Sequence, residues 1–123
     1  MKKLVLFTGL FLAASASLAV ARPLETYVAR LSAADHFNSN GERLTSIAAI
    51  IRQDRANLYV YGKGDPEDEE DSFFADKGNR ARLERMLERG SVTPSARRAI
   101  LDGTPMIRVE VHRDFINVDV YRD

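Results

Sequence analysis

The chain has 123 residues with 18 basic and 18 acidic side chains, and it contains no cysteine. The balanced charge gives no general attraction to nucleic acid or to an anionic membrane surface, so neither is an expected partner. Without cysteine there are no disulfides, no thiol catalysis and no lipid-modified cysteine anchor. Stability must therefore come from a packed core, or from a ligand or metal ion that binds the folded state.

Residues 1–21 have the three parts of a cleavable bacterial signal peptide. Lys2 and Lys3 give a positive start, a short apolar segment follows, and residues 19–21 (AVA) form a small-x-small cleavage site. The apolar segment is shorter than the roughly 20 residues that span a bilayer, so a retained anchor is the less favoured alternative. We expect a periplasmic or secreted protein with no stable membrane anchor, whose mature part, residues 22–123, is a single small domain.

The mature part begins with a predicted strand and a turn. Residues 25–33 alternate, with Tyr27, Ala29 and Leu31 on one side, which indicates a strand. Residues 35–43 (DHFNSNGER) follow, and their asparagine and glycine residues favour a tight turn because they tolerate positive φ.

A longer helix is predicted for residues 45–61. Leu44, Ile47, Ile51 and Leu58 recur at helical spacing, Thr45 or Ser46 can cap the start, and Gly62 can end the helix. The alternative is a small hairpin in which residues 42–51 form a second strand. The spacing of the apolar residues favours the helix.

Two short helices and a hairpin complete the chain. Residues 80–89 are expected to form a helix after Asn79 as N-cap, and residues 94–102 another after Thr93. Residues 106–111 and 116–121 both alternate and are separated by a short link, which predicts an antiparallel hairpin with one solvent-exposed face.

The expected fold class is α+β. A small three-stranded, mostly antiparallel sheet, made of the N-terminal strand and the C-terminal hairpin, would be covered by one longer and two short helices. The core would be formed where the apolar face of the hairpin meets the longer helix, by Ile107, Val109, Val118 and Val120 on the sheet and Ile47, Ile51 and Leu58 on the helix.

Asp54 falls in the middle of the apolar stripe of the longer helix. A buried carboxylate must find a partner or shift its pKa, because desolvating an unpaired charge is costly. The favoured interpretation is a structural anchor, paired with Arg55, Arg80 or loop amides and with a lowered pKa, so that Asp54→Asn destabilises the fold. The alternative is a binding cleft, for which the candidate residues are Asp35, His36, Arg52, Asp54 and Arg55.

Residues 65–76, here called the acidic segment, form a second candidate site. Asp65, Asp68 and Asp71 could offer oxygen ligands to calcium, although the spaced D-x-D-x-D-G pattern of a calcium loop is missing. The favoured alternative is a solvated loop, held back on the body by Phe73 and Phe74. Its charge would be neutralised by the arginines of the two short helices, which could instead hold a small anion: Arg80, Arg82, Arg85, Arg89, Arg97 and Arg98.

No catalytic motif is present. The two histidines lack zinc-site spacing, and there is no nucleophile elbow, Walker loop or dinucleotide glycine pattern. We therefore expect an exported, non-enzymatic binding or interaction module without a cofactor, whose partner is an unknown protein or a small anionic ligand. The alternative is a calcium-binding protein, or a small metal-dependent hydrolase, that uses the acidic segment.

Overall fold

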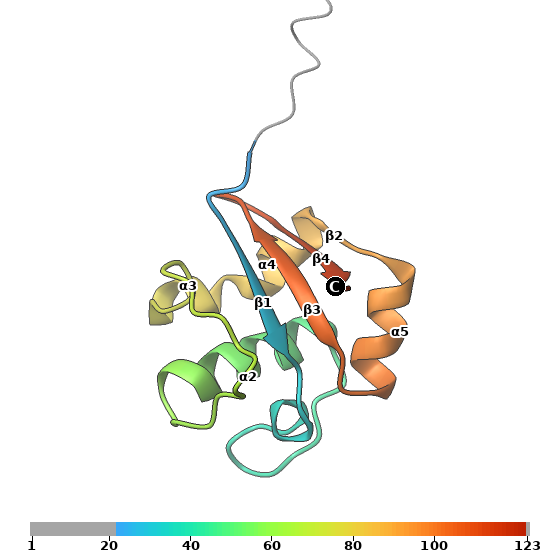
Figure 1. Ribbon diagram of the computed structural model, residues 1–123. Helices are drawn as coiled ribbons and strands as arrows, with labels where there is room; N and C mark the ends of the chain where they lie inside the picture. The colour runs from blue at the N-terminus through green and yellow to red at the C-terminus, as the bar shows by residue number, and fades with distance from the viewer. Residues whose placement is uncertain (1–21, 123) are drawn as a thin grey trace, which may run out of the picture.

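The computed structural model describes residues 22–122, so the signal-peptide prediction lies outside the described residues. The fold is α+β, with a small sheet whose inner face is covered by helices (Figure 1). In chain order the elements are β1 (Glu25–Arg30), η2 (Ala33–His36), α2 (Ile47–Tyr59), α3 (Lys77–Ala81), α4 (Leu83–Arg89), β2 (Ser91–Val92), α5 (Pro94–Asp102), β3 (Met106–Val111) and β4 (Ile116–Val120). Within residues 22–122, no helix combines the length and apolar character needed to cross a membrane.

The sheet has four strands in the order β1-β3-β4-β2. The β3–β4 hairpin and the antiparallel pairing of β1 with β3 confirm the predicted strands. The expected three-stranded sheet is wrong in one respect, because β2 adds a parallel strand on β4 and makes the sheet mixed. With only two residues, β2 is too short to show an alternating pattern in the sequence.

Gly90 explains how β2 reaches the sheet. It follows the last residue of α4, and its Cα lies so close to Ile116 that an added Cβ would be 1.7 Å from the Ile116 carbonyl oxygen. Only a residue without a side chain permits this approach. Gly90 therefore ends α4, as predicted, and also lets the chain run directly onto β4.

The core lies between the sheet and α2, α4 and α5. Tyr27, Ile107 and Val109 from the strands are fully buried, and α2 adds Ile47 and Ile51. Two expected core residues differ, because Val120 and Leu58 are only half-buried. Both lie near the ends of their elements, where fewer neighbours cover a side chain.

The helix predictions are confirmed for α2 and α5. Ser46 and Thr93 are the N-caps, and their side chains accept hydrogen bonds from Ala49 and Ala96. The hairpin alternative for residues 42–51 is wrong, since the turn makes only one isolated β-bridge, between Phe37 and Arg43.

The predicted helix over residues 80–89 is in fact two helices. α3 begins after Asp76, whose side chain accepts from the Asn79 amide, and the chain breaks at Arg82 before α4. Asn79 is not the N-cap, because its side chain donates to the Phe73 carbonyl instead.

Val109 offers a direct test of the core. Val109→Ala should lower the free energy of unfolding by about 1–3 kcal/mol, because a fully buried side chain is truncated and leaves a cavity. Val60, which is 57 % exposed, provides the matched control, and Val60→Ala should stay within about 0.5 kcal/mol. Urea unfolding measures both, and an unchanged midpoint for Val109→Ala would place Val109 outside the core.

Candidate cation site

The acidic segment is largely exposed, as expected for a solvated loop, but it is also held against the sheet. It runs along the free edge of β1, where the Glu69 amide donates to the Val28 carbonyl at 2.8 Å. Glu69 Oε1 in turn accepts from the Val28 amide, and Asp68 Oδ1 accepts from the Arg30 amide, both at 2.8 Å. The acidic side chains therefore take the place of a neighbouring strand by accepting from the outward amides of β1.

Near its end, the acidic segment is held by a second group of hydrogen bonds to β1. Glu25 on β1 accepts from Ser72 and Phe73, and these hydrogen bonds outweigh partial burial and lower the pKa of Glu25. Phe74 is fully buried and meets Tyr27 edge to face at 6.4 Å. Phe74, and Phe73 which packs partly buried beside it, hold the segment on the body as predicted.

The arginines of the short helices do not neutralise the acidic segment. Within residues 22–122, no ion pair links the two groups. Arg80 instead donates to the carbonyl oxygens of Phe74 and Ala75. The acidic segment pairs with Arg30 and Arg55, which come from elements earlier in the chain.

Arg55 is fully buried beneath the acidic segment. Its Nε donates to Asp54 at 2.9 Å and its Nη1 donates to Asp71 at 2.9 Å and to the Glu69 carbonyl at 3.0 Å. The guanidinium also lies 3.9 Å from the ring centroid of Tyr27, a cation–π distance. Burial alone would lower the pKa of Arg55, but these neighbours outweigh it and raise the pKa, so Arg55 is a permanent buried cation.

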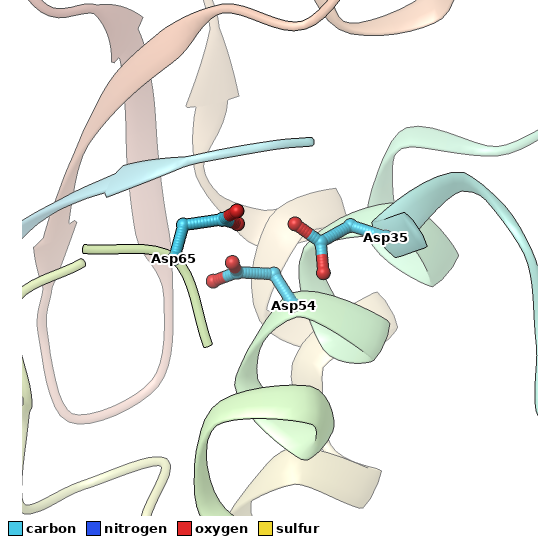
Figure 2. Close-up of side chains that lie close together, drawn as sticks. All are labelled: Asp35, Asp54 and Asp65. Atoms are coloured by element: carbon cyan, nitrogen blue, oxygen red, sulfur yellow. The ribbon is translucent and has the colours of Figure 1, made fainter. Parts of the chain in front are cut away.

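Three carboxylates meet beside this ion pair. Asp35 comes from η2, Asp54 from α2 and Asp65 from the start of the acidic segment, and Figure 2 shows their side chains gathered in one place. One oxygen from each lies within 4.8 Å of the others. We call these three residues the aspartate cluster.

Hydrogen bonds fix each member of the aspartate cluster. Asp35 accepts from the Ser32 amide at 2.9 Å and from the Asn57 side chain at 2.8 Å. Asp54 Oδ2 accepts from Arg55, and the Asp65 amide donates to Asp68 Oδ2 at 2.8 Å. The cluster is therefore positioned by hydrogen bonds that leave part of its oxygen atoms free.

Two of those oxygens are buried without a hydrogen-bond partner among the described residues. They are Asp54 Oδ1 and Asp65 Oδ2. Asp54 as a whole is only 1 % exposed, and two donors, Arg55 Nη2 and the Tyr27 hydroxyl, are likewise buried without a partner among the described residues. A buried acceptor without a donor is costly, and a group of them facing one another attracts either a proton or a cation.

The pKa directions agree with this geometry. Burial raises the pKa of Asp54 well above its usual value, and the nearby Asp35 and Asp68 add to the rise while Arg55 opposes it. Burial also raises the pKa of Asp35, against the hydrogen bonds from Asn57 and Ser32. The sequence-based expectation of a lowered pKa for Asp54 is wrong, because pairing with Arg55 does not compensate for burial beside other carboxylates.

The other predicted site residues are not members of the aspartate cluster. His36 is buried, and its ring nitrogens lie 2.8 Å from the carbonyl oxygens of Ser32 and Ile100. Arg52 is exposed and lines a separate groove on the outer side of α2. Asp68 accepts a hydrogen bond from the Asp65 amide, and Asp71 accepts from Arg55 and from the Tyr59 hydroxyl.

The sequence-based candidates omit two residues that shape the cluster, Ser32 and Asn57. Ser32 is the N-cap of η2, and a serine three residues before an aspartate is the signal that could have found it. Asn57 lies three residues after Asp54, so both fall on the same face of α2.

Comparisons with protein families, characterised proteins and solved structures found no match.

Proposed function

We propose that this protein is an exported, non-enzymatic calcium-binding module, with the aspartate cluster as its ion site. The observation that carries the proposal is the buried Oδ1 atom of Asp54. It accepts no hydrogen bond from residues 22–122 and belongs to a carboxylate gathered with those of Asp35 and Asp65. A divalent cation would satisfy the unpartnered oxygens of Asp54 and Asp65 at once, with Asp35 as the third carboxylate beside them.

The distances suit calcium. Calcium takes oxygen ligands at about 2.3–2.6 Å, so two of its ligands are at most about 5 Å apart. The spacing within 4.8 Å meets this limit. Calcium also accepts irregular ligand sets completed by water, whereas magnesium requires near-ideal octahedral geometry. Three carboxylates from three different elements are therefore better suited to calcium.

The surroundings support an ion as the ligand rather than a larger substrate. Among five of the surface cavities over the described part of the chain, none is lined by a member of the aspartate cluster, and one is lined by Asn57, which donates to Asp35. A metal-dependent hydrolase needs room for a substrate beside its ion. This favours a binding module over the hydrolase.

Thermal unfolding with calcium, with magnesium and with EGTA tests the proposal. Calcium at ten times its dissociation constant should stabilise the fold by about 1.4 kcal/mol, a rise in Tm of roughly 5–10 °C, and magnesium should do less. Asp65→Asn should remove most of the rise because it removes one charged ligand.

Glu70→Gln is the matched control. Glu70 lies in the same acidic segment and is exposed, and it makes no ion pair among the residues that the structure covers. Glu70→Gln removes the same charge as Asp65→Asn without changing the cluster. The calcium-induced rise in Tm should therefore stay. An equal Tm of the wild type in calcium and in EGTA would contradict the proposed calcium site. An equal loss of the calcium-induced rise in Tm in Asp65→Asn and Glu70→Gln would contradict it as well.

Export supports calcium as the available ion, since extracellular calcium modules work at high free calcium. Our proposal of export is supported by the sequence pattern of residues 1–21. We predict cleavage after Ala21, so that exported material begins at Arg22. N-terminal sequencing or intact mass measures this, and a mature protein that keeps Met1, or that is found only with membranes, would contradict it.

A further inference from the structure

β1 is an edge strand, because the sheet order places it at one end. Its inner side pairs with β3, while the amides of Val28 and Arg30 point outward. An open edge of this kind pairs readily with other extended chains. Here the acidic segment covers the edge with Glu69 and Asp68, so the state of this segment decides whether the edge is open.

One connection between this cover and the aspartate cluster is Asp68. Its Oδ2 accepts from the Asp65 amide and its Oδ1 accepts from the Arg30 amide, both at 2.8 Å. A single carboxylate thus joins a member of the cluster to an outward amide of β1. A displacement of Asp65 is therefore transmitted to the edge through one side chain.

A second connection is Arg55. It donates to Asp54 in the cluster, and on its other side it donates to Asp71 and to the Glu69 carbonyl. Glu69 is also the residue whose amide and side chain bind Val28. The cluster and the edge cover are therefore linked twice, once through Asp68 and once through its neighbour Glu69.

We propose that the cation bound by the aspartate cluster keeps the acidic segment on the β1 edge, and that loss of the cation opens this edge. The inference rests on the proposed calcium site. Without a cation, the carboxylates that stay ionised repel one another. Asp35 and Asp54 are fixed in η2 and α2, whereas Asp65 lies in a loop, so Asp65 moves away and draws Asp68 off Arg30.

Amide hydrogen exchange of the mature protein tests this coupling. In EGTA the amides of Val28 and Arg30 should exchange at least about tenfold faster than in saturating calcium, since local opening exposes them. The β3 amides that pair with β4 should change much less, because they lie inside the sheet. Asp68→Ala should leave the Arg30 amide in fast exchange in both conditions.

The outcomes separate this inference from the calcium site itself. If calcium binds but Val28 and Arg30 exchange equally fast with and without it, the coupling is wrong and the site stands. If all amides of the sheet accelerate together in EGTA, calcium stabilises the whole fold and the local opening is contradicted. If calcium does not bind, both proposals fail.

Discussion

Arg55→Met is expected to lower the free energy of unfolding by about 3–5 kcal/mol, the usual range for breaking a buried ion pair from one side. The substitution leaves Asp71 buried without its cation and removes the charge that faces Asp54. It also ends the cation–π contact with Tyr27 and the hydrogen bond to the Glu69 carbonyl. Urea unfolding at neutral pH measures the effect.

Arg52→Met is the matched control, because Arg52 lies on the same helix and is exposed. It should change stability by no more than about 0.5 kcal/mol. Arg55→Lys should fall between the two, since lysine keeps the charge but cannot direct separate donors at Asp54, Asp71 and Glu69. A loss below about 1 kcal/mol for Arg55→Met would show that the buried ion pair does not hold the acidic segment.

Asp54→Asn is expected to act in opposite directions with and without calcium. In calcium-free protein it should stabilise the fold by about 0.5–2 kcal/mol, because it removes a carboxylate whose charge is disfavoured by burial and by the nearby Asp35. An asparagine oxygen can still accept from Arg55, and its NH₂ group can face Asp35 and Asp65. In saturating calcium the variant should be the less stable protein, because a charged ligand is lost.

The stabilisation by Asp54→Asn should depend on pH. The folded-state pKa of Asp35 and of Asp54 lies above the unfolded value of about 3.9, so the folded state binds more protons between the two values. The stabilisation of the fold that comes from protonated Asp35 and Asp54 is complete below their unfolded-state pKa. It is lost as pH rises through their folded-state pKa. The calcium-free variant should therefore match the wild type near pH 4 and exceed it increasingly toward neutral pH.

Calcium-free unfolding curves at several pH values measure this dependence. A constant difference between variant and wild type across the range would mean that Asp54 does not titrate with folding. A destabilised Asp54→Asn protein in the absence of calcium would restore the anchor interpretation, in which the bond to Arg55 outweighs the repulsion.

The sequence was sufficient to predict the elements that depend on local pattern. The alternation in β3 and β4, the Ser46 and Thr93 caps and the apolar stripe of α2 all predict what the structure contains. The elements that it did not predict depend on contacts between distant segments. β2 exists because Gly90 can approach Ile116, and no pattern within two residues reports such a contact.

The same distinction applies to the candidate site. The spacing in α2 identifies Asp54 as buried, and Arg55 was among its expected partners. The meeting of Asp54 with Asp35 and Asp65 depends on how η2 and the acidic segment pack against α2. The use of Glu69 and Asp68 as acceptors for β1 amides is also a tertiary effect, since a run of acidic residues normally indicates solvated surface.

Isothermal titration of residues 22–123 with calcium tests the proposed ion site most directly. We predict one calcium ion per chain with a Kd below about 1 mM, within the range of extracellular calcium sites. Asp65→Asn should remove this binding and Glu70→Gln should retain it. The absence of saturable binding up to about 5 mM calcium, or binding that is unchanged in Asp65→Asn, would contradict the aspartate cluster as a calcium site.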